Sequence, residues 1–185
     1  LKKSISVPGP LADAKRYVVV APGSVWQTKR WMAAGFGAVV QRLLEFEEDL
    51  VVALIGSPNE AAEGTIVQGL VGEHERLINL IGRTTILEMR DLIAHAALLV
   101  ANDSSPIHFA SAFDVPTVAI FGSTISEMGF GPLATRSEVI EHEGLECRPC
   151  SDHGPKKCPL SHFKCMRSIS SERVFSACKR LLTVG

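Results

Sequence analysis

The chain has 185 residues, of which 46% are hydrophobic and 21% are charged, and this composition is typical of a folded globular protein. It excludes intrinsic disorder, collagen-like fibres and coiled coils. The 19 Lys and Arg residues nearly balance the 20 Asp and Glu residues, so the net charge of −1 creates no global field that would hold nucleic acid or an anionic membrane.

The first residues, 1–16, contain Pro8-Gly9-Pro10 and no hydrophobic periodicity, so we expect a linker or tail there. The β-branched run at 17–21 stops at Pro22-Gly23 and is typical of a strand buried on both faces. Apolar runs of the same kind predict further strands at 51–55, 77–81, 98–101 and 116–121, and a last short strand is expected at 138–141. Spacings of three and four residues predict helices at 32–48, 60–72, 85–95, 107–113 and 171–182. Thr85 and Glu88 have the spacing of a capping box at the start of the third helix.

This alternation of strands and helices predicts an α/β fold with a Rossmann-like, doubly wound parallel sheet. Small and polar residues follow the carboxyl end of each of the first five expected strands. Ligands bind beyond the carboxyl ends of such strands, so the sequence predicts a binding crevice at that edge. The alternative is that these loops contain turn residues only because they are turns.

The loop after the first strand carries the hydroxyls of Ser24 and Thr28 and the cations of Lys29 and Arg30. Basic residues just before a helix are unfavourable to the helix dipole, which suggests a bound anion such as a phosphate. A solvated basic loop with Trp31 packed on the core is the alternative. No Walker motif is present.

The run from Asn102 to His108 is the densest group of polar residues. A helix that begins near Ser104 would place Pro106 in its first turn and leave free N–H groups for a pyrophosphate. Asp103 has two compatible interpretations, a helix cap or an acceptor for a sugar hydroxyl, and His108 is either a ligand or a structural residue. Glu60, which opens a helix after the second strand, fits either a ribose contact or a favourable helix-dipole interaction.

Four of the five cysteines form the pattern C-x2-C-x7-C-x6-C at Cys147, Cys150, Cys158 and Cys165. These thiolates are close enough in the chain to surround one tetrahedral zinc ion. Local disulfides and free thiols remain alternatives. Cys178 lies at a helical position beside apolar residues and is expected in the core.

No run of 18 apolar residues and no signal-peptide pattern is present, so we expect a cytosolic protein. The chain does not begin with Met, which suggests a fragment or a processed piece.

Four motifs in fixed order resemble one known family: Pro22-Gly23-Ser24 with Lys29-Arg30-Trp31, Gly82-Arg83-Thr84-Thr85, Asn102-Asp103-Ser104-Ser105-Pro106-Ile107-His108, and Gly122-Ser123-Thr124. Over residues 17–182 they are similar to the C-terminal half of glycosyltransferase family 9, the ADP-heptose:lipopolysaccharide heptosyltransferases. The resemblance implies that residues 17–185 form the nucleotide-sugar-binding domain of a GT-B enzyme, with a cysteine-rich segment at 147–165.

The resemblance also implies a reaction, the inverting transfer of heptose from ADP-heptose to the lipopolysaccharide inner core, with no cofactor required for catalysis. The acceptor and the proposed Asp base would belong to an N-terminal domain that this chain lacks, so the chain alone is expected to be inactive. It implies a cytoplasmic protein at the inner face of the bacterial inner membrane, with at most peripheral membrane contact. Another GT-B nucleotide-sugar transferase or epimerase, or a non-catalytic nucleotide-binding domain, is the alternative.

Carried over by position, the resemblance assigns Lys29, Ser24 and the N–H groups of Ser104, Ser105 and Ile107 to the diphosphate. It assigns Glu60 to the ribose, and Gly82 and Thr84 to the adenine pocket. Asp103 would contact the heptose, and His108 would have an assisting role. Lys29, Asp103 and His108 are the expected catalytic residues. The chain departs from the family at Ser105, where Gly is usual, and at Met32, where Pro is usual.

Overall fold

The computed structural model describes residues 11–183 and contains a six-stranded sheet with the order β3-β2-β1-β4-β5-β6. Every pair of neighbouring strands is parallel. The strands are β1 (Arg16–Ala21), β2 (Leu50–Leu54), β3 (Leu77–Asn79), β4 (Leu98–Asn102), β5 (Thr117–Phe121) and β6 (Ser137–Glu141). The predicted α/β class and parallel sheet are therefore confirmed.

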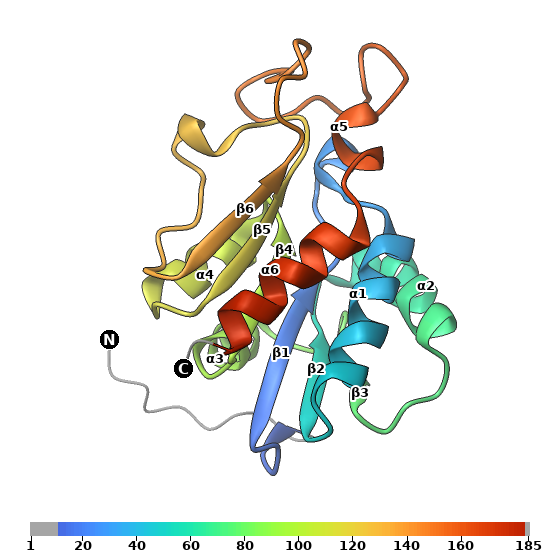
Figure 1. Cartoon of the computed structure of the whole chain (residues 1–185), viewed down its shortest axis with the longest axis vertical. Coiled ribbons are helices and arrows are strands. Elements are labelled where there is room, and N and C mark those ends of the chain that lie inside the picture. The colour runs from blue at the N-terminus through green and yellow to red at the C-terminus, as the bar shows by residue number, and fades with distance from the viewer. Residues whose placement is uncertain (1–10, 184–185) are drawn as a thin grey trace.

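Helices cover both faces of this sheet, with α1, α2 and α6 on one face and α3 and α4 on the other (Figure 1). Their bounds are α1 (Ala33–Phe46), α2 (Ala61–Val71), α3 (Ile86–Ala94), α4 (Ser105–Ala112), α5 (Lys164–Arg167) and α6 (Ser171–Thr183). Each predicted strand and helix is present, and its ends differ from the prediction by at most two residues. The short α5 and the 3-10 helices η2 (Gln27–Lys29), η3 (Pro58–Glu60) and η4 (Ser126–Met128) were not expected.

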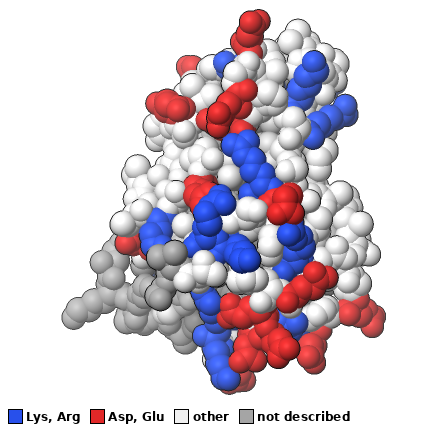
Figure 2. Space-filling view, in the orientation of Figure 1, with Lys and Arg blue, Asp and Glu red and all other residues white. Residues whose placement is uncertain are grey.

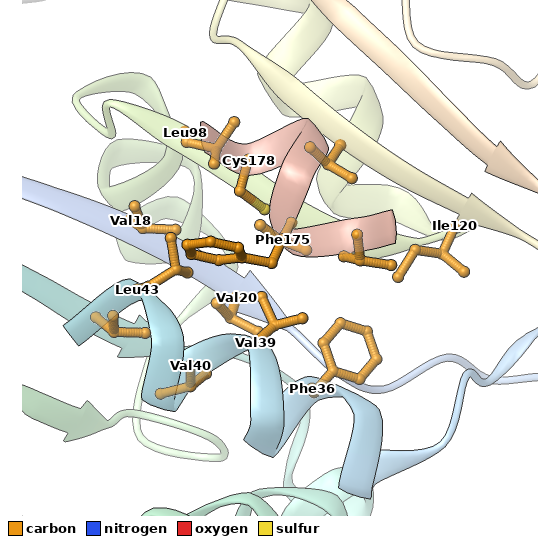
Figure 3. Packing of buried hydrophobic residues seen from close by; sticks show 14 of the residues in the cluster. Val18, Val20, Phe36, Val39, Val40, Leu43, Leu98, Ile120, Phe175 and Cys178 are labelled. Carbon is orange, nitrogen blue, oxygen red and sulfur yellow. The ribbon is translucent and has the colours of Figure 1, made fainter. Parts of the chain in front are cut away.

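The core has two halves because side chains alternate across the buried strands. On β1, Val18 and Val20 face α1 and α6, whereas Val19 and Ala21 face α3 and α4. Figure 3 shows Phe175 of α6 lying between these β1 valines and α1. Cys178 is fully buried in the same half, which confirms its predicted place in the core.

The beginning of the chain differs in part from the predicted linker. Residues 1–10, which include Pro8-Gly9-Pro10, lie outside the described residues. Leu11 is only 1% exposed and packs in the core half that contains α3 and α4. Arg16 already belongs to β1, and its Nη1 pairs with Glu47 Oε2 at 2.8 Å. Leu11 and Arg16 therefore belong to the folded domain and not to the linker or tail predicted for residues 1–16.

The surface carries charges of both signs in close mixture. Figure 2 shows Lys and Arg interspersed with Asp and Glu on the face formed by α1 and α6, as the net charge of −1 leads one to expect. Between residues 11 and 183, no helix combines the length and the apolar character that a bilayer crossing requires.

Candidate functional site

The carboxyl ends of all six strands meet at one edge of the sheet, near the top of Figure 1. The strand order reverses between β1 and β4, and a crevice forms at such a point because the flanking loops diverge. A cavity of about 590 Å³ opens there and is lined by the loops that follow β1, β2, β3 and β4. The predicted crevice is therefore present.

An ion pair between Lys29 and Asp103 lies at the base of this cavity. The loop after β1 folds into η2 and presents Lys29, whereas Asp103 comes directly after β4. Lys29 Nζ and Asp103 Oδ2 are 2.6 Å apart, and their side chains are only 10% and 4% exposed. Thr124 Oγ1 donates to the same carboxylate oxygen at 2.6 Å. Asp103 is not the cap of α4, because Ser104 holds that position and the Asp103 carboxylate is engaged by Lys29.

Asn102 fixes the loop after β1 against β4. Its fully buried side chain donates from Nδ2 to the carbonyls of Pro22 and Gly23, at 2.8 and 3.2 Å. Its Oδ1 accepts from the Trp31 N–H at 2.9 Å. Sequence reasoning did not assign Asn102 this role. An amide residue at the end of an otherwise apolar strand was the available signal, because a buried amide must find backbone partners.

The two cations of the first loop have different surroundings. Arg30 Nε donates to the Ser24 carbonyl at 2.6 Å, and its guanidinium pairs with Glu63 of α2. Lys29 lines the cavity, and Arg30 does not. The predicted basic patch thus reduces to Lys29, and Arg30 holds the loop in place. Ser24 is 3% exposed and lines the cavity, while Trp31 packs in the core.

The amino end of α4 forms one wall of the cavity. Ser104, Ser105 and Pro106 line it, with Pro106 in the first turn as predicted, and exposed His108 lines it one turn further. Ile107 is placed differently. Its N–H donates to the Ser104 carbonyl at 3.2 Å and its side chain is fully buried, so the structure puts Ile107 behind the wall.

Glu60 lies where the loops after β1 and β2 meet. Its Oε2 accepts from the Ser57 N–H at 2.6 Å, which closes a capping box at η3. Its carboxyl group also rests against Gly23, where an added Cβ would lie 2.1 Å from Glu60 Oε1. Thr84 lines the cavity, but Gly82 does not. Gly82 lies behind Pro58 with φ of +72°.

Several lining residues were not singled out from the sequence. Phe130 lies in the loop after β5, and its ring centroid is 6.0 Å from Lys29 Nζ. Trp26 of the loop after β1 also lines the cavity. Apolar side chains cover a further part of the wall: Val25, Pro58, Ile86 and Met89. Phe130, Pro58 and the α3 pair Ile86 and Met89 come from three separate parts of the chain, so no local pattern marks them as one surface.

The cysteine-rich segment, residues 147–165, packs directly against the loop that carries Lys29 and the turn after β5. The Cys150 N–H donates to the Ser123 carbonyl at 2.8 Å, and Thr28 Oγ1 donates to the Pro155 carbonyl. Gly154 has φ of +81°, and an added Cβ there would lie 3.2 Å from Lys29 Cε. This segment therefore forms the back of the Lys29 side of the site.

The predicted zinc ligands, Cys147, Cys150, Cys158 and Cys165, are free thiols in the structure. Within residues 11–183, no group of three or more His, Cys, Asp and Glu side chains has an arrangement that could hold a metal ion. Burial, together with the charges of Cys147 and Cys158, raises the pKa of Cys150, and burial raises the pKa of Cys165 to about 11. The thiols as placed do not fit a four-thiolate site, and zinc stays a prediction.

Comparison with known proteins finds one matching family. The sequence model of glycosyltransferase family 9 (heptosyltransferase) matches residues 5–160. The chain is similar to lipooligosaccharide heptosyltransferase 2 of Campylobacter jejuni, with 32% identity over 174 residues that cover 94% of this chain and 54% of the relative. The chain spans about half the length of the curated relatives it matches.

Two solved structures share the fold. One is the E. coli ADP-heptose LPS heptosyltransferase II, with a TM-score of 0.76 and 24% identity, covering 92% of this chain and 47% of that one. The other is an E. coli heptosyltransferase with ADP, with a TM-score of 0.66 and 16% identity, covering 91% of this chain and 45% of that one.

Proposed function

The chain belongs to glycosyltransferase family 9, the heptosyltransferases, and we propose that residues 17–185 are the donor-binding domain of an inverting enzyme that transfers heptose from ADP-heptose to the lipopolysaccharide inner core. The observation that carries this proposal is the Lys29–Asp103 pair at the base of the cavity, where the strand order reverses. One of the similar E. coli structures is named an ADP-heptose LPS heptosyltransferase, and the other is a heptosyltransferase solved with ADP, which supports the proposal.

Lys29 and the amino end of α4 would bind the diphosphate. Lys29 is the only Lys or Arg among the described residues that line the cavity. The N–H groups at the start of α4, around Ser104 and Ser105, add the positive end of the helix dipole. Negative charge develops on the diphosphate as the glycosidic bond breaks, and donors held in advance at that position stabilise the transition state. Lys29 would therefore act on both binding and rate.

The remaining polar residues divide between the sugar and the nucleoside. Asp103 would accept hydrogen bonds from heptose hydroxyls, and His108, which also lines the cavity, would assist. Glu60 would hold the ribose, and Thr84 would lie beside the adenine together with the apolar side chains of Ile86 and Met89. A cavity of about 590 Å³ has the size of known small-molecule sites.

Inversion needs a base that takes the proton from the acceptor hydroxyl as it attacks from the face opposite the diphosphate. A facing second domain would bind the lipopolysaccharide acceptor and supply that base, so this chain by itself would bind the donor without transferring the sugar. This view agrees with relatives about twice as long as the chain. The enzyme would work at the cytoplasmic face of the inner membrane with at most peripheral contact.

Calorimetric titration of the chain with ADP, UDP and GDP tests the nucleotide. We expect ADP to bind most tightly, because only its base would fit the adenine wall, whereas the Glu60 contact with the ribose is common to all three nucleotides. Equal or tighter binding of UDP or GDP would instead favour another nucleotide-sugar transferase or epimerase.

Lys29→Ala tests the diphosphate assignment. We expect the ADP affinity to fall at least about tenfold, because a charge-assisted contact is lost. Lys15→Ala is the matched control, since Lys15 is exposed and lies beside Asp49, before β1 and away from the crevice edge. An unchanged ADP affinity in a folded Lys29→Ala protein would remove Lys29 from the site.

A further inference from the structure

Thr124 follows β5, and neither the resemblance nor the proposed function gives its side chain a role. It is fully buried, and its Oγ1 donates to Asp103 Oδ2 at 2.6 Å. Lys29 Nζ lies 2.6 Å from the same oxygen. Two donors from different loops, one neutral and one charged, therefore share one oxygen of a carboxylate that is 4% exposed.

The turn that carries Thr124 is held from behind by the cysteine-rich segment. The Arg148 side chain, which is 5% exposed, donates from Nε to the Gly122 carbonyl and from Nη2 to the Thr124 carbonyl at 2.7 Å. The Cys150 N–H donates to the Ser123 carbonyl at 2.8 Å. Three successive carbonyls are thus engaged, which fixes the backbone of the turn and keeps Thr124 beside Asp103.

We propose that Thr124 is a positioning residue for the diphosphate site, an inference that rests on the proposed function. When a diphosphate binds, the Lys29 ammonium directs its charge to the phosphate oxygens, and Asp103 loses part of its counter-charge while it stays buried. A buried carboxylate without a partner is unfavourable. The Thr124 hydroxyl supplies the hydrogen bond that remains, so Lys29 can engage the anion without leaving Asp103 unpartnered.

Substitution of the hydroxyl alone tests this role. Thr124→Val keeps the branched shape and removes the donor, and calorimetric titration with ADP should show an affinity about tenfold weaker than that of the unsubstituted chain. Thr124→Ser keeps the donor and should bind ADP within about twofold of the unsubstituted chain. Thr124→Ala removes the same donor without the second methyl group, and it should show the loss even if the Val variant folds poorly.

Thr117→Val is the matched control. Thr117 is also fully buried, begins the same strand at its other end, and donates from Oγ1 to the Val115 carbonyl at 2.9 Å. This variant loses a hydroxyl of the same kind and should bind ADP as the unsubstituted chain does.

A double-mutant cycle with Asp103→Asn separates positioning from a general structural effect. With no carboxylate to hold, Thr124→Val should leave the ADP affinity of Asp103→Asn unchanged. An equal loss in both backgrounds, or an unchanged affinity of Thr124→Val alone, would overturn the assignment of Thr124 and leave the proposed function standing. If the unsubstituted chain binds no ADP, the proposed function fails and the assignment of Thr124 fails with it.

Discussion

Lys29 and Asp103 compensate each other's charge in a part of the cavity that is nearly closed to water. Their side chains are 10% and 4% exposed, so either charge alone would carry a large desolvation cost. The pairing explains how the Lys29 ammonium can remain charged in this nearly buried position. Asp103 and a diphosphate would also compete for the Lys29 ammonium, so a stronger Lys29–Asp103 ion pair means a weaker affinity for the diphosphate.

Asp103→Asn should separate nucleotide binding from sugar binding. Without the carboxylate, Lys29 no longer has a competing anion, so we expect ADP to bind at least as tightly as to the unsubstituted chain. The assigned heptose contact is weakened, so any preference for ADP-heptose over ADP should shrink or disappear. Calorimetric titration with the two ligands measures both effects.

Asp114→Asn is the control for this substitution, because Asp114 is exposed and accepts hydrogen bonds from Thr135, outside the cavity. An Asp103→Asn protein that keeps the full preference for ADP-heptose would show that Asp103 does not contact the sugar.

The start of α3 could be predicted from four consecutive residues, because Thr85 and Glu88 form a capping box there. The Glu88 N–H donates to Thr85 Oγ1 at 3.2 Å, and Glu88 Oε2 accepts from the Thr85 N–H at 2.7 Å. The prediction is confirmed because both partners lie in the same turn. The hydrogen bond from the Thr85 N–H is the largest cause that holds the pKa of Glu88 below its ordinary value, and the hydrogen bond from the Thr85 hydroxyl is the second.

Acid should therefore weaken the fold partly through Glu88. Its pKa is lower in the folded chain than in the unfolded chain, so the stabilisation is present above the ordinary carboxyl pKa and is lost as the pH falls through the lowered, folded value. Glu88→Gln can still form the box but has no carboxylate to protonate. We expect its free energy of unfolding to fall less steeply with acid than that of the unsubstituted chain.

Urea unfolding at a series of pH values measures this difference. Glu45→Gln is the control, because Glu45 is an exposed residue of α1 outside any capping box, and its curve should run parallel to that of the unsubstituted chain. Identical acid slopes for Glu88→Gln and the unsubstituted chain would contradict the role of the box in acid sensitivity.

The cysteine-rich segment is joined to the end of β6 and to the turn after β5 by hydrogen bonds and an ion pair. Arg148 is the centre of these contacts. It binds three backbone carbonyls, those of Gly122, Thr124 and His142, and its Nη2 pairs with Glu141 of β6 at 2.7 Å. The segment therefore supports the site whether or not its thiols bind a metal.

Arg148→Met should destabilise the whole fold by about 3 kcal/mol, because it leaves a mostly buried carboxylate and several carbonyls without their donor. Arg180→Met is the matched control. Arg180 pairs with Glu138 on the same strand at 2.6 Å, but its side chain is 60% exposed, so the free energy of unfolding should change little. Equal losses in urea unfolding would show that Arg148 contributes no more than a surface ion pair.

The sequence by itself determined the layout of the chain. Strands and helices were predictable because hydrophobic period and local caps are read over a few neighbouring residues. The order of these elements fixed the edge of the sheet at which Lys29, Asp103 and Glu60 would gather. The short α5 escaped prediction because four residues show no period.

Which neighbour each polar group contacts became clear from the folded structure. Lys29 and Arg30 are adjacent cations in the sequence, yet one lines the cavity and the other binds Glu63, because α2 passes beside only one of them. Asp103 joins Lys29 and Thr124, and Ile107 turns into the core, for the same reason. Lys29 and Asp103, for example, lie 74 residues apart. A local pattern carries no information about a contact that forms only when the sheet brings separate loops together.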